Sequence, residues 1–355
     1  MNKQERMEKY RKMVEGKGLW EVDHPDVRAF YERAEAEGVE LVSNNVPHLG
    51  LFRAPYSQNL DGVDIVIIGL PMDIGVPNPR PGTRNAPRAV RFWGLDRNMV
   101  NYANNLCPFD ICNIVDYGDL EFMDNPYDLT SNLNEISRLY GEFKDRNIVP
   151  LTIGGEHTCT FATLRGLGKD EPLAVVHLDA HGDTSVGFQG SEVSDASLFQ
   201  NAACGGYILP EKMVQVGQRG RGIIRCDFST NSGMRRIMAD EAQEKGMDYV
   251  VSEIKRVVGD HPCYLTIDTD CLDCGEMPGT TLPEPFGLFG REVRDIIRGM
   301  YGMNLVGADI MELSPDFDQT GKSACLAAGL AFEMMCLLAE SKARQNGEKH
   351  QTHWK

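Results

Sequence analysis

The stretch "LAVVHLDAHGD", residues 173–183, places an apolar run directly before three side chains of metal-binding type. The run from Leu173 to Leu178 is short and rich in valine, which is typical of a strand buried on both faces. Asp179, His181 and Asp183 then follow at every second position. Two carboxylates that flank an imidazole repel each other unless a cation lies between them. The stretch therefore predicts a buried strand that ends at a metal half-site, with ordinary polar residues at a strand end as the alternative.

Similar apolar runs recur along the chain and alternate with helix-like segments. The runs are residues 63–69, 148–153, 213–216, 263–267 and 305–310, and the helix-like segments include residues 130–146, 232–246 and 320–344. This alternation predicts one three-layer α/β/α domain over residues 61–345, with a mostly parallel central sheet. Residues 1–60 are polar and helix-prone and predict an N-terminal helical extension, and residues 346–355 predict a polar tail.

The composition limits the classes of partner. The chain has 355 residues, of which 42% are hydrophobic, so it can bury a large core. Its net charge of −16 argues against nucleic acid or an anionic membrane as a partner. The charged start has no signal-peptide core, and no apolar stretch has membrane-spanning length, so we expect a cytoplasmic protein. The ten cysteines are expected to be reduced, and "CLDC" at 271–274 lacks the second pair that a zinc site needs.

Three more strand ends carry residues of metal-binding type. "TIGGEHT" contains Glu156 and His157, "TIDTDCLD" contains Asp268 and Asp270, and "DIMELSPD" contains Glu312. Each motif also has an ordinary explanation, such as a tight turn or a helix cap. In parallel sheets, however, ligands bind at the carboxyl ends of the strands. Together, the carboxylates and histidines at these strand ends suit two divalent transition-metal ions that share bridging carboxylates.

With these motifs the sequence resembles the ureohydrolase family, which comprises arginases, agmatinases and other guanidino hydrolases. G-G-E-H-T at 154–158, D-A-H-x-D at 179–183, D-x-D-x-x-D at 268–273 and "RPGTRNAPRAVR" at 80–91 carry the likeness, which spans about residues 63–340. The resemblance implies an arginase-like fold, hydrolysis of a guanidino C–N bond, and a trimer or hexamer. It also implies two divalent metal ions, either nickel or manganese.

The resemblance assigns roles residue by residue. One ion would bind His157 and Asp183, the other His181 and Asp270, while Asp179 and Asp268 would bridge both. The ions would activate a water that attacks the guanidinium carbon. Asp183 would orient this water, and Glu312 would hold the guanidinium NH groups. His177 lies on the same strand face as Asp179 and is expected to contact the ligands without binding a metal.

Departures from the family pattern bear on the substrate. Agmatinases carry a proton-shuttle histidine in the loop after D-A-H-x-D, and Asp195 of "SDASLF" stands in its place. In "PGTTLPEPFG", 278–287, Leu282 and Phe286 replace small residues, which predicts a narrower and more apolar pocket unless they pack outside it. "PHLGLFRAPY", 47–56, is similar to segments of the guanidine hydrolase and metformin (biguanide) hydrolase branch, for which nickel is expected. Manganese is expected for arginases and agmatinases.

The first hypothesis is therefore a hydrolase of a small cationic guanidine or biguanide. The alternatives are an agmatinase-like or guanidinobutyrase-like enzyme, and a non-catalytic subunit that supports a homologous chain in a mixed oligomer. A zinc deacetylase-type hydrolase also uses aspartate and histidine at strand ends, but it does not predict the complete series of motifs.

Overall fold

The computed structural model describes residues 3–15, 50–75, 79–95, 100–101, 103–186, 192–223 and 227–347. The chain forms two compact units, residues 1–46 and 47–355. Within the first unit, Lys3–Val14 form the helix α1. The rest of the predicted extension up to residue 49, and the tail from residue 348, lie outside the described residues. Residues 50–60, which the sequence analysis placed in the extension, belong to the second unit, where Leu51 and Phe52 are buried.

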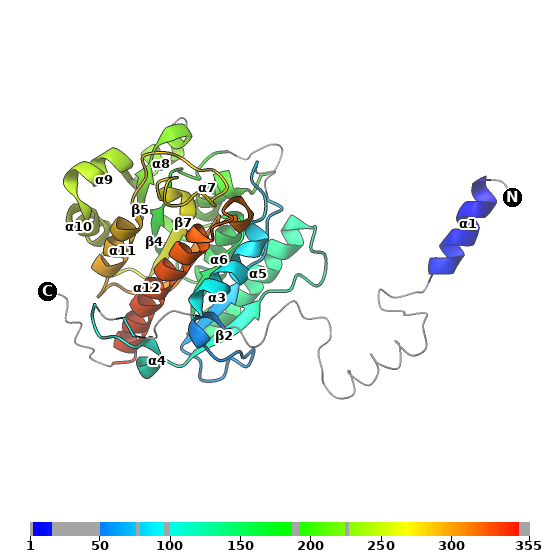
Figure 1. Ribbon diagram of the computed structural model, residues 1–355, viewed down its shortest axis with the longest axis horizontal. Coiled ribbons are helices and arrows are strands. Elements are labelled where there is room, and N and C mark those ends of the chain that lie inside the picture. The colour runs from blue at the N-terminus through cyan, green and yellow to red at the C-terminus, as the bar shows by residue number, and fades with distance from the viewer. Residues whose placement is uncertain are drawn as a thin grey trace. The chain divides into compact units, whose positions relative to one another are not determined.

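Eight parallel strands form one sheet in the described part of the second unit (Figure 1). Their order is β2-β1-β3-β8-β7-β4-β5-β6, and each pair of neighbours is parallel. The predicted parallel sheet is thereby confirmed. The strands are β1 Ile65–Gly69, β2 Ile114–Asp119, β3 Val149–Ile153, β4 Leu173–Leu178, β5 Ile208–Gln218, β6 Arg235–Met238, β7 Cys263–Asp268 and β8 Leu305–Met311.

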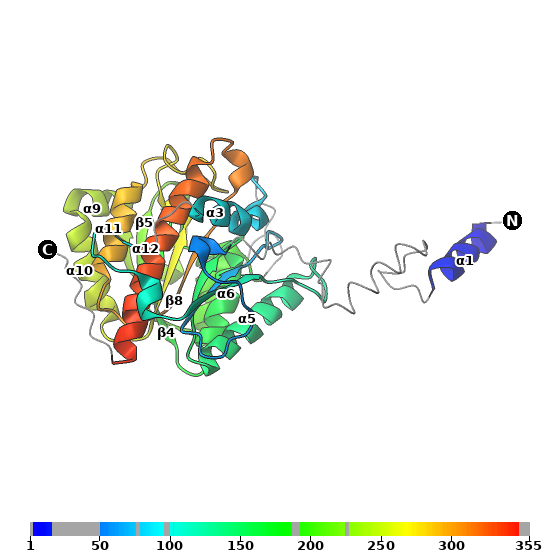
Figure 2. The same ribbon diagram turned by 60° about the horizontal axis from the view of Figure 1, so that its bottom comes forward.

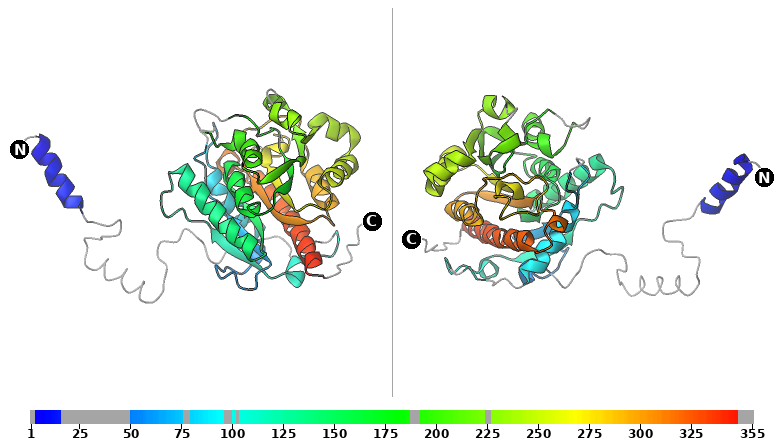
Figure 3. Two further views of the ribbon diagram at one scale, coloured as in Figure 1. Left: turned by 180° about the vertical axis from the view of Figure 1, so that it is seen from behind. Right: turned by 45° about the horizontal axis from the view of Figure 1, so that its top comes forward.

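Helices cover both faces of this sheet, as Figures 2 and 3 show. Successive strand residues point to opposite faces, so Ile65 and Ile67 join one buried cluster while Val66 and Ile68 join the other. Helices α5, α6 and α7 contribute to the second cluster, and α3, α9, α10, α11 and α12 contribute to the first. Their bounds are α3 Ala86–Gly94, α5 Leu129–Asp145, α6 Thr158–Leu167, α7 Leu198–Cys204, α9 Ala239–Lys245, α10 Met247–Val258, α11 Gly290–Gly299 and α12 Lys322–Gln345, with the short α4 Pro108–Ile111 and α8 Asp227–Asn231.

Both edge strands depart from the sequence prediction. β2 was not predicted, and residues 232–246 were expected to be helical throughout, whereas Arg235–Met238 form β6 before α9 begins. Among the described strands β6 pairs only with β5, and Ile237 is the one buried side chain of its four. An edge strand tolerates charged side chains because one side of it faces no neighbour. The local sequence therefore lacks the continuous apolar run that identified the inner strands.

Helix α12 also corrects an expectation. No apolar stretch of membrane-spanning length was expected from the sequence. An 18-residue window of α12 nevertheless has a mean hydropathy of 1.5, which is apolar enough to cross a membrane by length and composition alone. Within the domain, 83% of that window is buried. Its apolar character is thus accounted for by packing on the sheet, as in the core helix of a globular domain.

Candidate metal centre

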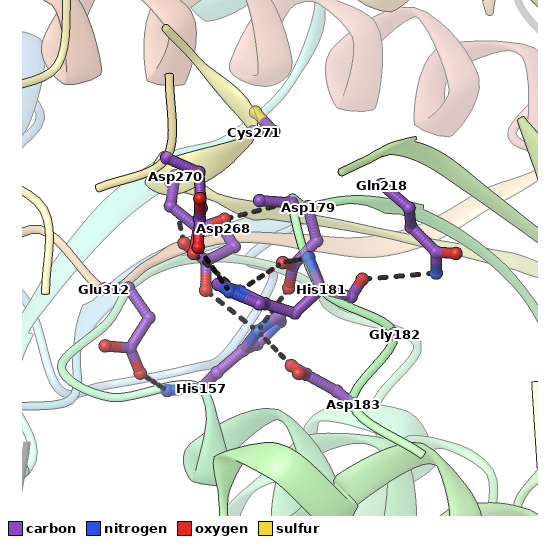
Figure 4. A network of polar contacts seen from close by, with 12 residues as sticks. His157, Asp179, His181, Gly182, Asp183, Gln218, Asp268, Asp270, Cys271 and Glu312 are labelled. Atoms are coloured by element: carbon purple, nitrogen blue, oxygen red, sulfur yellow. Dashed lines mark hydrogen bonds and ion pairs between the residues drawn. The ribbon is translucent and has the colours of Figure 1, made fainter. Parts of the chain in front are cut away.

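Four adjacent strands bring the predicted strand ends together. β3, β8, β7 and β4 are neighbours in the sheet, and Ile153, Ile310, Ile267 and Leu178 lie in register across them. The polar residues that follow therefore emerge along one carboxyl edge, which is where ligands bind in parallel sheets. The structure brings together all six predicted metal ligands at this edge (Figure 4).

One half of the cluster forms around His157, which is fully buried at the start of α6. Its Nδ1 lies 3.0 Å from Asp183 Oδ2, 3.3 Å from Asp268 Oδ2 and 3.4 Å from Asp179 Oδ2. Within the described residues this nitrogen has no hydrogen-bond partner, whereas Nε2 lies 2.9 Å from Thr266 Oγ1. A buried ring nitrogen that faces three carboxylate oxygens is the environment that a metal ligand requires.

The other half forms around His181. Its Nδ1 lies 2.8 Å from Asp270 Oδ2 and 3.3 Å from Asp179 Oδ1. Asp179 therefore presents one oxygen to each histidine, which is the geometry of a bridging carboxylate. Asp268 faces only His157 among the two histidines, since its Oδ1 accepts a hydrogen bond from the Asp270 amide at 2.8 Å. Its bridging role stays a prediction.

The electrostatics of the cluster fit bound cations. Burial, together with the charge of Asp179, raises the pKa of Asp183 to about 8. Burial and the neighbouring Asp270 and Asp179 raise the pKa of Asp268 well above its usual range. Burial alone would lower the pKa of His157, but the three carboxylates outweigh it and raise this pKa. Without a cation, protons would have to relieve the repulsion between these acids, and divalent ions can take the place of those protons.

Two of the site acids have an unusual backbone. Asp183 has φ 50° and Glu312 has φ 65°, in the left-handed region that residues other than glycine rarely adopt. Glu312 is buried, and its oxygens accept hydrogen bonds at 2.5 Å from the His157 amide and from Thr281 Oγ1. The surrounding contacts thus hold this carboxylate beside the metal cluster at a cost in backbone strain.

The G-G-E-H turn places a further acid beside this site. A Cβ atom on Gly155 would lie 1.9 Å from the Met72 carbonyl oxygen, so only glycine fits there. Glu156 is buried, and its Oε1 accepts hydrogen bonds from the Ile74 and Gly75 amides at 3.1 and 2.6 Å. In the part of the chain that the structure describes, its Oε2 has no hydrogen-bond partner. Burial raises the pKa of Glu156 to about 8, and the negative charge of Asp195 contributes to the rise.

The comparisons with known proteins agree with this geometry. The family model described as "Arginase family" matches residues 63–337. The chain belongs to the arginase family. It is similar to guanidinopropionase of Pseudomonas aeruginosa, with 36% identity over 82% of this chain and 92% of that one. The mitochondrial agmatinase of Gallus gallus is 33% identical over 84% of this chain and 88% of its own.

A solved structure confirms the arginase-like fold. The proclavaminate amidino hydrolase of Streptomyces clavuligerus has a TM-score of 0.78 at 34% identity, covering 82% of this chain and 97% of that one. The predicted ureohydrolase resemblance is confirmed, and this arginase-family chain is a metal-dependent hydrolase. The guanidine and biguanide branch stays a prediction.

The predicted substrate residues of this arginase-family protein occupy different environments. Asp195 begins the 3-10 turn before α7, and its charge helps to raise the pKa of Glu156 and of Glu312. Leu282 is half-buried, beside Thr281, which bonds to Glu312. Phe286 is 77% exposed, and its backbone amide donates to Asp273 Oδ2 at 2.7 Å. The assignment of Leu282 and Phe286 to the pocket stays a prediction.

Several residues near the cluster were missed or only partly noticed in the sequence. Thr266 contacts His157, and Glu284 Oε1 lies 3.9 Å from His181 Nε2. Gln215 lies 3.2 Å from Nδ1 of the buried His177. A polar residue inside an apolar strand was the available signal for Thr266 and Gln215, because a buried polar side chain needs a specific partner. Glu284 had no such signal.

Proposed function

We propose that this arginase-family hydrolase cleaves a C–N bond of a small guanidine or biguanide, releasing urea or guanylurea with an amine or ammonia. The observation that carries the proposal is the buried Glu312 carboxylate, which the His157 amide and Thr281 Oγ1 hold beside the cluster. Glu156 and Asp195 are close enough for their charges to raise the pKa of Glu312. When Glu312 holds the guanidinium, the nearby acids Glu156 and Asp195 would favour a second nitrogen group close to the reacting carbon. A biguanide carries such a group, and a compact guanidine fits beside it.

The cluster residues divide the work. His157 and Asp183 would hold one divalent ion, His181 and Asp270 the other, and Asp179 with Asp268 would lie between them. When bound, such a pair of ions supplies a water of lowered pKa as the nucleophile. Asp183 would accept a hydrogen bond from this water and orient it. Glu312 would pair with the planar guanidinium through both oxygens, which fixes the orientation of the substrate.

The relatives support an alternative class of substrate, in which the guanidino group carries a longer tail. This chain is similar to a guanidinopropionase and to an agmatinase, whose names indicate substrates with a tail that ends in a carboxylate or an amine. The two acids near Glu312, which are Glu156 and Asp195, would disfavour a carboxylate tail, and this counts against a guanidino acid. An agmatine-like substrate remains the alternative. Nickel is expected with a guanidine or biguanide, and manganese with agmatine.

The assembly and location complete the proposal. We expect a trimer or hexamer, as a homo-oligomer or with a homologous subunit, in the cytoplasm. A purely supporting role for this chain is disfavoured because all six ligand positions are occupied by ligand-type residues that converge.

A product assay on the purified full chain tests the substrate. The protein is loaded with Mn²⁺ or Ni²⁺ and given guanidine, dimethylbiguanide, agmatine and guanidinobutyrate, and urea, guanylurea, ammonia and amine are measured. We expect the highest kcat/KM for guanidine or dimethylbiguanide. A clear preference for agmatine or guanidinobutyrate would overturn the substrate, and no hydrolysis with either metal would overturn the catalytic role.

A further inference from the structure

A row of polar side chains crosses the sheet beneath the metal cluster. Thr266 of β7, His177 of β4, Gln215 of β5 and Arg236 of β6 are successive partners in register on neighbouring strands. His177 and Gln215 are fully buried. Since the strands around them are apolar, each of these buried groups requires a defined hydrogen-bond partner.

Arginine fixes the direction of the hydrogen bonds at one end of this row. Arg236 Nε donates to Gln218 Oε1 at 2.6 Å, and a guanidinium can only donate. The Gln218 amide nitrogen therefore points the other way, toward Gln215 Oε1 at 2.9 Å and the His181 carbonyl at 3.2 Å. Figure 4 shows Gln218 directed at the loop that carries His181 and Gly182.

A second contact fixes the orientation of the Gln215 side-chain amide. Its Nε2 donates to the Gly182 carbonyl oxygen at 2.7 Å, and a carbonyl can only accept. The same Nε2 lies 3.2 Å from His177 Nδ1. Because this amide nitrogen offers only hydrogens, His177 Nδ1 has to be the bare, accepting nitrogen of a neutral ring. The ring hydrogen is then on Nε2, which lies 2.7 Å from Asp179 Oδ2.

This tautomer determines which hydrogen bonds the Asp179 carboxylate accepts. His177 donates to Oδ2, and the His181 amide donates to Oδ1 at 2.5 Å. Each carboxylate oxygen accepts one hydrogen bond from the protein and keeps a lone pair on the side of one cluster histidine. A His177 ring of the opposite tautomer would present a bare nitrogen to this carboxylate and would itself compete as a ligand.

We propose that Gln215 is a positioning residue that holds His177 in the Nε2–H tautomer, so that His177 orients the bridging carboxylate of Asp179 and does not bind metal. Arg236 and Gln218 act through Gln215. The inference rests on the proposed metal-binding role of Asp179. Partners that orient metal ligands in this way typically contribute 10–100-fold, in rough terms, to metal affinity.

The tautomer can be measured without metal. The full chain is labelled with [¹⁵N]histidine and studied metal-free at pH 8 by long-range ¹H–¹⁵N correlation, with His177 assigned from the spectrum of the His177→Gln variant. We expect His177 to be neutral, with its proton on Nε2. A proton on Nδ1, or on both nitrogens, overturns the proposal whatever the substrate is.

Metal binding tests the consequence. In equilibrium dialysis with Mn²⁺ and with Ni²⁺, Gln215→Glu should weaken binding about 10-fold or more, because a carboxylate would draw the ring proton to Nδ1. Gln345→Glu, at the opposite end of the sheet near Asn304, is the matched control and should bind like wild type. Gln218→Glu should also weaken metal binding. This second variant still tests the proposal if Gln215→Glu fails to fold.

The number of ions separates positioning from ligation. His177→Gln retains a donor at the place of Nε2, so the variant should bind two ions per chain. One ion per chain in this variant, or wild-type affinity in Gln215→Glu, overturns the positioning role. A wild-type chain that binds neither Mn²⁺ nor Ni²⁺ overturns the metal site itself. The tautomer measurement needs no metal, so it separates failure of the metal site from failure of the role proposed for Gln215.

Discussion

At the scale of single residues, the backbone and two hydrogen bonds hold the position of the Glu312 side chain. This residue adopts a left-handed backbone conformation, and two donors at 2.5 Å hold its carboxylate beside His157 and Thr281. Burial, and then the charge of Asp195, raise the pKa of Glu312 well above its usual range. A permanently cationic guanidinium is the partner that would keep this buried group ionised.

The charge of Glu312 is expected to matter for the substrate and not for the metals. Glu312→Gln keeps the size of the side chain but loses one charge-assisted pairing, which is worth roughly 1.5–3 kcal/mol. We expect kcat/KM to fall about 10–100-fold with two metal ions still bound. Steady-state kinetics with metal analysis checks this. Loss of an ion in Glu312→Gln would make the residue a ligand or a structural group.

Asp195 is predicted to select the substrate. Asp195→Ala should raise KM for guanidine or dimethylbiguanide, because a second nitrogen group loses its partner. Asp195→His should not improve the native reaction and should shift preference toward agmatine, whose leaving amine needs a proton. KM and kcat for both substrates check this. If wild type prefers agmatine and Asp195→Ala leaves each KM unchanged, the substrate argument is wrong.

At the scale of elements, the start of α12 is linked to the loop beside Glu312. Asp318 Oδ2 accepts hydrogen bonds from Ser323 N at 2.7 Å and Ser323 Oγ at 2.6 Å, and Ser323 Oγ accepts one from Gly279 N at 2.9 Å. Burial would raise the pKa of Asp318, but these bonds and those of Thr320 lower it to about 2. The carboxylate thus stabilises the folded state in its ionised form.

This predicts a stability effect that depends on pH. Asp318→Asn should cost about 1 kcal/mol of unfolding free energy at pH 7, as for loss of a helix cap. Because the folded pKa is depressed, the difference from wild type is complete above the unfolded pKa of roughly 4 and disappears as pH falls toward about 2. Urea unfolding at pH 7, 4 and 3 checks this, with exposed Asp295→Asn as a control expected to change little.

The buried inner strands could be predicted from the sequence, β5 only within its buried part, and the edge strands could not. β3, β4, β7 and β8 consist almost wholly of buried residues, so each appears as a continuous apolar run. β2 contains Asp116, which bonds to Arg91 and to the Leu51 amide, and β6 begins with two arginines. These charges are satisfied by tertiary contacts that no local pattern reveals.

At the scale of the whole molecule, strand order decides the site. The sequence identified six ligand-type residues, but their convergence depends on β8 lying between β3 and β7, a neighbour relation between segments far apart in the chain. The motif resemblance carried that information, whereas periodicity did not. Contacts made by residues within the strands, such as Thr266 with His157, became visible only in the folded arrangement.

Assembly is predicted at the same scale. We expect light scattering of the intact chain to give the mass of a trimer or hexamer, and deletion of residues 1–45 to weaken assembly more than it lowers the unfolding temperature of the domain. The deletion ends before the second compact unit begins at Pro47, so that unit is left intact. A fully active monomer in the intact chain would refute this.

The most direct test of the proposed two-metal site is anomalous X-ray diffraction from crystals of the full chain loaded with Mn²⁺ or Ni²⁺, recorded at the absorption edge of the metal. We predict two peaks, roughly 3.5–4 Å apart, one beside His157 and Asp183 and the other beside His181 and Asp270, with Asp179 between them. Asp179→Ala should lose at least one peak. A single peak, a peak ligated by His177, or an unchanged pair in Asp179→Ala would contradict it.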